Sequence, residues 1–255
     1  MELRRQLLTE NRCYIRGDRL SPKGVMVHST GANNPNLRRY VQPDDGALGT
    51  NRYGNDWNQP EPSVCVHAFI GRLQDGTVAV YQTLPWQMRG WHAGRGARGS
   101  ANDTHIGFEL CEDDLSDPAY FAAVYRAAVE LTAFLCRRYG LDPSASGVVI
   151  DHAEGCALGI ASNHGDIGHW LRRYGKTMDD FRNAVREEAF EMRYRTLKDL
   201  RAQGAYYLPT VERLLRQGIL RGKGGTGEDT VLDLGEDSLR LLVLLDRAGL
   251  LPKED

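Results

Sequence analysis

Short hydrophobic runs recur through the first 150 residues, and each is bounded by Gly, Pro, Asp or Asn. Their high content of Val, Ile and aromatic residues is typical of β-strands. The second and third runs are separated by GRLQDG, in which the Asp75-Gly76 step favours a hairpin turn. We therefore predict five strands, at residues 24–29, 64–70, 77–83, 105–111 and 147–150.

The segment between the last two predicted strands has a helical pattern. Ser116 or Asp117 is a suitable N-cap, Pro118 fits the first turn, and Gly140 followed by Pro143 ends the helix. Apolar residues recur at steps of three and four, which gives the helix one face that can cover a sheet. These residues are Phe121, Val124, Ala128, Leu131 and Leu135.

A further helix is predicted from Met178 to about Tyr194, so the fold class is α/β (α+β), a central mixed β-sheet flanked by helices. After residue 195 the pattern changes to two short amphipathic helices, TVERLLRQGIL and EDSLRLLVLLDRAGLL, joined by the glycine-rich RGKGGTGEDT. A helical hairpin of this size buries little core by itself. We predict a main domain over residues 1–194 and a small helical module over residues 195–255.

The composition excludes several classes of partner. Because 32 Lys and Arg nearly balance 34 Asp and Glu, no uniform charge favours nucleic acid or an anionic membrane surface. The N-terminus lacks the apolar run of a signal peptide, and we expect no membrane span, so the chain is expected to be made in the cytoplasm. Five scattered cysteines indicate reduced thiols rather than a disulfide framework.

Three polar residues lie at or near the ends of predicted strands, where an open sheet commonly builds a site. They are His28, Glu109 and His152. Two histidines and a carboxylate suit a metal ion with a neighbouring acid or base. His152-Ala-Glu also fits half of a zinc deaminase signature, but that signature needs a Cys-x-x-Cys pair and none is present. The partners of His152 must therefore lie elsewhere in the chain.

Four separated motifs together resemble one known family. They are MVHSTG, the VHAFIG hairpin followed by LPWQMRGWHAG, the strand IGFELCED, and HAEGCALGIASNHGDIGHW. In this order, over about residues 20–187, they are similar to the zinc-dependent N-acetylmuramoyl-L-alanine amidases of the type-2 family, which are related to peptidoglycan recognition proteins. Phage and clostridial-type endolysins are especially similar. The resemblance implies a Zn²⁺ cofactor, bacterial peptidoglycan as partner, and cleavage of the amide between N-acetylmuramic acid and L-alanine.

The resemblance also implies a ligand set. In the family, zinc is held by two histidines and an Asp or Cys, and the fourth position is left for water. By position, the ligands here are His28, His152 and Asp166. Because Asp166 follows His152 by 14 residues, a longer spacing than in many relatives, Cys156 and His164 remain alternatives for the third ligand.

Further residues match functional positions of the family. Glu109 corresponds to the glutamate that takes a proton from the attacking water and passes it to the leaving amine. Other members use a tyrosine that is replaced here by Val66. His164 stands where relatives often have a lysine that stabilises the oxyanion, and a histidine can donate the same hydrogen bond. His67, Trp91 and His92 match positions that flank the substrate groove, although such residues also pack in cores. We expect structural roles for His105 and His169, and a position beside the ligands or on the surface for Glu154.

Two other functions remain open from the sequence. One is a peptidoglycan-binding module without catalysis, and the other is a zinc hydrolase that cleaves a different amide. The complete ligand set together with Glu109 favours the amidase. The lack of a signal peptide favours a phage or prophage lysin that reaches the cell wall after phage-mediated release.

The C-terminal module resembles, over a short length, the tails that follow the catalytic domain in related lysins. We therefore expect an accessory role in wall targeting or association, with a homodimer as one form of association. The alternative is that the module packs on the main domain and stabilises it. Its two predicted helices present more apolar surface than a two-helix hairpin can bury.

Overall fold

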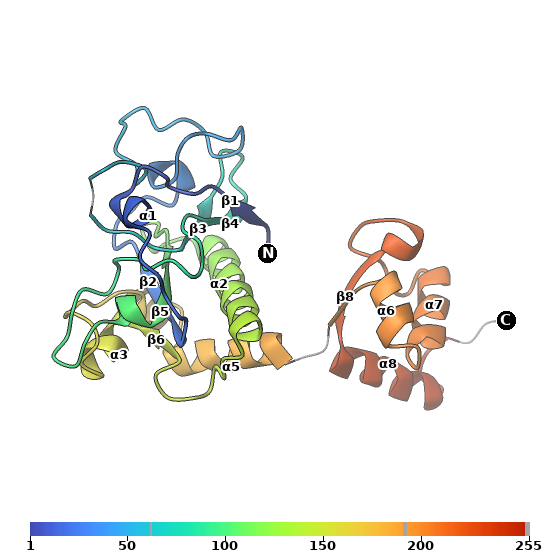
Figure 1. The fold of residues 1–255 in the computed structure, drawn as a ribbon. Helices are drawn as coiled ribbons and strands as arrows, with labels where there is room; N and C mark the ends of the chain where they lie inside the picture. Colours follow the sequence, from blue (N-terminus) through green and yellow to red (C-terminus); the bar gives the residue numbers. More distant parts are fainter. Residues whose placement is uncertain (62, 191–192, 253–255) are drawn as a thin grey trace. The chain divides into compact units, whose positions relative to one another are not determined.

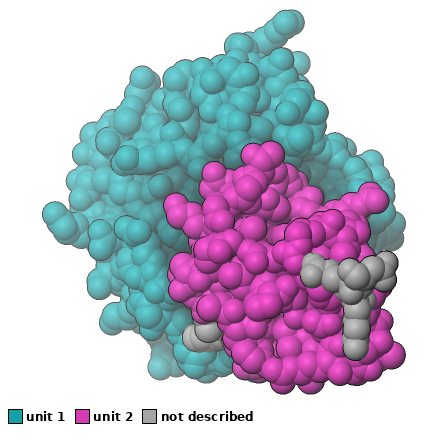
Figure 2. Space-filling model, turned by 90° about the vertical axis from the view of Figure 1, so that its right-hand side faces the viewer, with its two compact units in different colours: residues 1–189 teal, residues 190–255 magenta. Residues whose placement is uncertain are grey.

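The computed structural model describes residues 1–61, 63–190 and 193–252 (Figure 1). The chain divides into two compact units, Met1–Ala189 and Phe190–Asp255, which Figure 2 shows in separate colours. The division lies earlier than the predicted boundary at residue 194, which falls inside a strand of the second unit.

The first unit is built on a mixed sheet, as predicted, but the sheet has six strands rather than five. The strand order is β1-β4-β3-β5-β2-β6, and every neighbouring pair is parallel except β3 and β4, which form the predicted hairpin. The short edge strand β1 was not predicted, and β3 begins later than expected. The strands are β1 (Leu3–Arg5), β2 (Gly24–Ser29), β3 (Ala68–Arg72), β4 (Val78–Gln82), β5 (His105–Leu110) and β6 (Val149–Asp151).

One face of the sheet is covered by α2 (Pro118–Tyr139), which lies along the strands in Figure 1. The side chain of Asp117 caps this helix by accepting hydrogen bonds from the backbone N–H groups of Ala119 and Tyr120. Gly140, in the left-handed conformation, ends the helix. By length and composition α2 is long enough to cross a membrane, contrary to the expectation that no segment approaches that length. Its apolar face, however, shares one core with the strands, so it is a core helix.

The pleat of β2 and β5 determines which side chains reach the opposite face. Val25 and Val27 of β2 pack in the core with α2, as do Ile106 and Phe108 of β5. The residues between them point to the other side, because successive side chains alternate along a strand. His28 and Glu109 are directly paired in the parallel register of β2 and β5. The two side chains therefore lie next to each other on the face opposite α2.

Shorter elements complete the first unit. The helix predicted from Met178 ends at Phe190 rather than near Tyr194, which lies instead in a strand. Smaller apolar clusters on the face opposite α2 include Phe69 and Tyr81, and separately Met26 and Ile150. The remaining elements are α1 (Arg12–Arg16), η1 (Leu37–Arg39), η2 (Ala101–Asp103), α3 (His152–Ala157), α4 (Gly168–Arg173) and α5 (Met178–Phe190).

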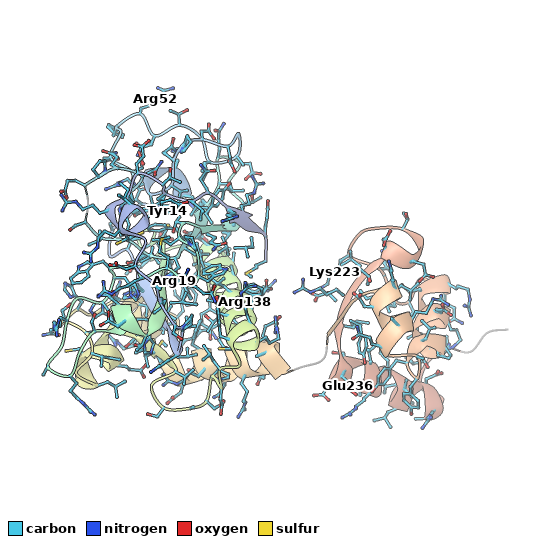
Figure 3. All side chains as sticks on the ribbon, in the orientation of Figure 1. Tyr14, Arg19, Arg52, Arg138, Lys223 and Glu236 are labelled. Atoms are coloured by element: carbon cyan, nitrogen blue, oxygen red, sulfur yellow. The ribbon has the colours of Figure 1, made fainter. Side chains whose placement is uncertain are left out.

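The second unit is more than the predicted helical hairpin. Strands β7 and β8 pair antiparallel, and an additional helix, α6, follows β7. Leu214 and Leu239, which lie in the two predicted amphipathic helices, are buried, and the unit has a core of its own that includes Tyr194 and Leu232. Figure 3 shows side chains in the interior of each unit. The elements are β7 (Arg193–Thr196), α6 (Leu197–Gln203), α7 (Leu208–Arg216), η3 (Gly227–Asp229), β8 (Val231–Gly235) and α8 (Glu236–Arg247).

Candidate metal centre

His28 is the fifth residue of β2 and is almost completely buried, with 1% of its surface exposed. Burial lowers the pKa of His28, although a hydrogen bond with Asp166 opposes this shift. The imidazole is therefore neutral near pH 7, which is the protonation state that binds a metal ion.

His152 is held in place by the start of a helix. It is the first residue of α3, directly after β6, and Asp151 is the N-cap. The side chain of Asp151 accepts a hydrogen bond from the backbone N–H of Glu154 (2.7 Å), and the carboxylate of Glu154 accepts one from the backbone N–H of Asp151 (3.2 Å). This capping box, together with the ion pair between Glu154 and Arg182 (2.9 Å), fixes the backbone that carries His152.

Asp166 lies in the loop between α3 and α4, and a hydrogen bond from the next residue holds that loop against β2. The backbone N–H of Ile167 donates to the hydroxyl of Ser29 (2.8 Å), the residue that follows His28. Ile167 is fully buried, which holds the loop at this position. The long spacing between His152 and Asp166 is therefore bridged by a loop that returns to the sheet.

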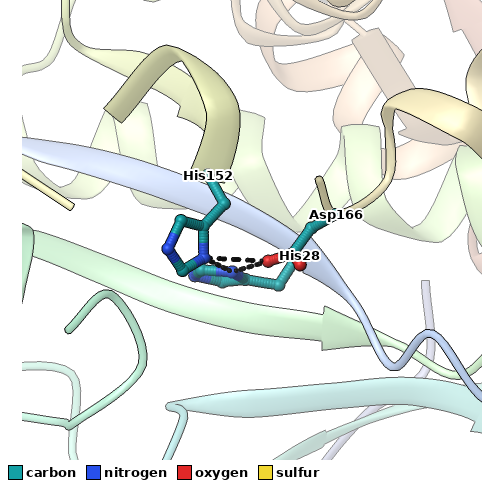
Figure 4. A group of neighbouring side chains, drawn as sticks. All are labelled: His28, His152 and Asp166. Carbon is teal, nitrogen blue, oxygen red and sulfur yellow. Dashed lines mark hydrogen bonds and ion pairs between the residues drawn. The ribbon is translucent and has the colours of Figure 1, made fainter. Parts of the chain in front are cut away.

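Three potential ligand atoms converge at this point (Figure 4). The Oδ2 atom of Asp166 lies 2.6 Å from Nδ1 of His28 and 3.0 Å from Nδ1 of His152, and the two Nδ1 atoms are 3.3 Å apart. Ligand atoms bound tetrahedrally to zinc at about 2.0–2.1 Å lie about 3.3 Å from one another. The two Nδ1 atoms thus have the spacing expected for two ligands of one tetrahedral ion, and the Oδ2 atom lies closer to both, at hydrogen-bond distance.

The donor set also fits a zinc ion chemically. Burial alone would raise the pKa of Asp166, but the hydrogen bonds from His152 and His28 outweigh it and lower the pKa well below its ordinary value. Two imidazoles and one carboxylate are a donor set typical of catalytic zinc sites. In the described part of the chain, the group of side chains that fits a metal contains neither Cys156 nor His164.

Glu109 provides a buried carboxyl group beside the three residues. Its Oε2 atom is buried and has no hydrogen-bond partner among the described residues. Burial raises the pKa of Glu109 well above its usual value, and the charges of Asp166 and Glu112 raise it further. A buried polar atom without a partner is costly, and strongly shifted carboxyl groups concentrate at functional sites.

The remaining candidates lie around this group. His164 is exposed on the loop before Asp166, with its ring centroid 4.9 Å from that of His152. Trp91 is 40% exposed, and the guanidinium of Arg89 lies over its ring. His92 is half-buried, and its Nδ1 atom is 3.0 Å from Nε2 of His28, a contact that the sequence did not indicate.

The structure corrects the position expected for His67. Its side chain is fully buried, so it does not line a groove. Its Nδ1 accepts a hydrogen bond from the backbone N–H of Gly107 (3.1 Å), and its Nε2–H donates to the carbonyl oxygen of Met88 (2.7 Å). Burial lowers the pKa of His67 to about 4, so it is a neutral packing residue.

Two histidines that we expected to be structural lie outside the ligand group. His105 is buried, and its Nε2–H donates to the carbonyl oxygen of Gly147 (2.9 Å). His169 lies 3.0 Å from the carboxylate of Glu112, a buried acid that sequence reasoning did not single out. Its place in IGFELCED, three residues after Glu109, was the signal that could have identified it.

The part of the chain that carries this site matches a known protein family. The family model described as N-acetylmuramoyl-L-alanine amidase matches residues 18–169, which is more than half of the chain. The chain belongs to this amidase family. The matched segment contains His28, Glu109, His152 and Asp166, and the family resemblance drawn from the four sequence motifs is confirmed. A comparison with curated protein sequences gives no significant match.

Several solved structures share the amidase fold. A Staphylococcus aureus hydrolase, AmiA, in complex with its ligand has 19% identity and a TM-score of 0.55, and the alignment covers 74% of this chain and 83% of that one. The structure of PlyL has 20% identity and a TM-score of 0.51, with coverage of 74% and 99%. A mutant endolysin from Bacillus subtilis has 21% identity and a TM-score of 0.50, with coverage of 72% and 99%. At these identities the likeness shows the fold alone, and the site must be argued from its own residues.

Proposed function

We propose that this amidase cleaves the bond between N-acetylmuramic acid and the L-alanine of the stem peptide in a zinc-dependent reaction. The observation that carries the proposal is the convergence of His28, His152 and Asp166 beside Glu109, whose Oε2 atom is buried, within a chain of the amidase family. A structural neighbour described as an endolysin supports a site of action on the bacterial cell wall.

Zinc would be held through Nδ1 of both histidines and Oδ2 of Asp166. When bound, it supplies a Lewis acid for the scissile carbonyl and lowers the pKa of water to about 7. Burial keeps the imidazole of His28 neutral, and the two histidines keep Asp166 ionised, so the ligands are ready to bind a cation at neutral pH.

Glu109 is the proposed general base and acid. It accepts a proton from the attacking water and later delivers this proton to the departing amine of L-alanine. A carboxyl group with an ordinary pKa is a weak base and is rarely protonated near pH 7. The burial that raises the pKa of Glu109 makes it both a stronger base and a better proton reservoir.

Two further residues are proposed to contact the substrate. His164 is exposed beside His152 and has a ring N–H that can donate to the developing oxyanion. Trp91 presents an exposed ring that can pack on a sugar or peptide.

The reaction can be tested on dye-labelled peptidoglycan. We expect the zinc-loaded protein to release soluble fragments, a chelator to stop the release, and added zinc to restore it. Mass spectrometry should then find stem peptides with a free L-alanine N-terminus. Products cut in the glycan or at another amide would contradict the proposed bond, and binding without release would indicate a non-catalytic recognition module.

For the second unit we propose an accessory role in wall targeting or self-association. Each of the described apolar clusters draws its residues from one unit, so the second unit does not supply the core of the first. Apolar side chains remain on its surface in α8 and beyond it, including Leu241, Leu244 and Leu250. Such surface favours contact with another body.

Truncation after Ala189 tests this role. We expect the shortened protein to stay folded and to retain zinc, because its core is complete, but to lose binding to intact cell walls or to change from dimer to monomer in light scattering. A cut after Tyr194 is less suitable, because that side chain belongs to the core of the second unit. The full-length variant carrying Leu241→Ser and Leu244→Ser is the matched control for surface contact. A truncated protein that unfolds, or that keeps both wall binding and oligomeric state, contradicts the accessory role.

A further inference from the structure

Each of the two proposed histidine ligands has a second ring nitrogen, Nε2. Both Nε2 atoms are connected by hydrogen-bond contacts to the same short segment, residues 92–93. Nε2 of His28 is 3.0 Å from Nδ1 of His92. Nε2 of His152 is 3.3 Å from the hydroxyl of Ser162, and this hydroxyl is 3.3 Å from the carbonyl oxygen of Ala93. His92 and Ala93 are neighbours in the loop between β4 and β5.

The contacts of this segment give each Nε2 proton an acceptor when a cation occupies the two Nδ1 atoms. Binding a cation through Nδ1 requires the proton of each ligand to be on Nε2. The Nε2–H of His28 then donates to Nδ1 of His92, whose own Nε2–H donates to the carbonyl oxygen of His105 (3.2 Å). A carbonyl oxygen only accepts, so this chain of hydrogen bonds has one direction.

The second chain starts at the other ligand. With an ion on Nδ1, the Nε2–H of His152 donates to the hydroxyl of Ser162, whose own proton can go to the carbonyl oxygen of Ala93 (3.3 Å) or to Nδ1 of His164 (3.1 Å). In the metal-free protein, Nδ1 of each ligand faces the carboxylate of Asp166, and a bound ion would move each ring proton to Nε2, where an acceptor is in place.

A glycine makes the approach of His92 possible. Gly107 lies opposite Met26 in the β2–β5 register. This pair is two residues before the pair formed by His28 and Glu109, so it lies on the same face of the sheet. A Cβ atom at Gly107 would lie 2.4 Å from Nδ1 of His92 and 2.5 Å from its Cγ. The ring of His92 thus occupies the space that any other residue at position 107 would fill.

The backbone of the segment is fixed by Asn102, which is fully buried. Its Oδ1 accepts hydrogen bonds from the N–H groups of His92 (2.7 Å) and Ala93 (3.0 Å), and its Nδ2 donates to the carbonyl oxygen of Gly94 (3.0 Å). The side chain of Asn102 therefore holds the backbone of three consecutive residues. Such support is needed to orient other groups within a few tenths of an ångström.

We propose that the segment 92–94, clamped by Asn102, is a positioning element that sets the tautomer and ring orientation of both histidine ligands. His92 is then a positioning residue, in place of the groove role expected from sequence. The inference rests on the proposed function, because it assumes that His28 and His152 bind zinc.

The first test measures zinc affinity by competition with a chromogenic chelator. His92→Phe keeps a ring of similar size but removes the acceptor, and we expect zinc binding about 10- to 100-fold weaker, the usual effect of losing such a partner. His92→Asn keeps an acceptor near Nδ1 and should restore most of the affinity. Ser162→Ala should weaken binding through the other ligand, and Arg95→Ala, an exposed change in the same loop, is the control that leaves affinity unchanged.

The second test reads the tautomers by ¹⁵N–¹H correlation spectra of the zinc-loaded protein. We expect His28, His152 and His92 all to carry the proton on Nε2. A His92→Phe protein that is folded by circular dichroism and binds zinc as tightly as the wild type, or a His92 protonated on Nδ1, overturns the inference. If a variant fails to fold, the wild-type tautomers decide. A wild-type protein that binds no zinc would instead overturn the metal site of the proposed function.

Discussion

Replacing His28, His152 or Asp166 with alanine is expected to abolish zinc binding and hydrolysis together. A site with three protein ligands that loses one of them loses both affinity and geometry. The metal contributes several kcal/mol to transition-state stabilisation, so turnover should fall by about 1,000-fold or more. Metal content after dialysis, measured by mass spectrometry, and dye release from labelled peptidoglycan check the two losses on the same sample.

Cys156→Ala is the control for this series. Its side chain is outside the converging group, so the variant should keep its zinc. His164→Ala should also retain zinc, although turnover should decrease if His164 contacts the oxyanion. If Asp166→Ala keeps full occupancy while Cys156→Ala or His164→Ala loses it, the third ligand has been assigned wrongly.

Glu109→Gln is expected to lower turnover by at least about 100-fold while zinc and fold are retained. Gln preserves the shape of the side chain but cannot accept a proton, and a positioned acid or base contributes about 100- to 10,000-fold. Kinetics on labelled peptidoglycan, with metal content measured in parallel, separate this effect from loss of zinc. Near-normal turnover would mean that another group is the base.

The same substitution should stabilise the metal-free protein at neutral pH. Burial raises the folded-state pKa of Glu109 above the ordinary value of 4.5, so the folded state binds the proton more tightly than the unfolded state. The associated stability is present below pH 4.5 and is lost as the pH rises through the raised pKa. Glu109→Gln removes this loss, and Tm at pH 7 should rise by about 2 °C or more. A lower Tm across the whole pH range would contradict the buried-charge account.

The strands that carry the site were predictable because their patterns are strong. GVMVHS and HIGFEL are rich in β-branched and aromatic residues, and the positions of His28 and Glu109 near their ends indicated that both side chains belong to the site. The fold class was predicted correctly because these strand patterns are strong. The family resemblance was correct because the same strands form part of its motifs. The edge strand β1 has three residues, too few to show a pattern.

Other features depend on contacts that no local pattern encodes. The position of Asp166 beside the two histidines depends on contacts such as the hydrogen bond between Ile167 and Ser29, residues far apart in the chain. The contact of His92 with His28 depends on the missing side chain of Gly107 on another strand. In the second unit, β8 follows a glycine-rich segment, and its pairing with β7 was hidden because each strand is short.

The proposed ligand set joins distant parts of the chain, since His28 and Asp166 are separated by 138 positions. An ion held between them would act as a reversible cross-link that closes most of the first unit into a loop. Metal ions that bind only the folded state add their binding free energy to the free energy of unfolding. Resistance to heat and to proteases would then follow the availability of zinc, so the ion proposed for hydrolysis would also set how long the protein stays folded.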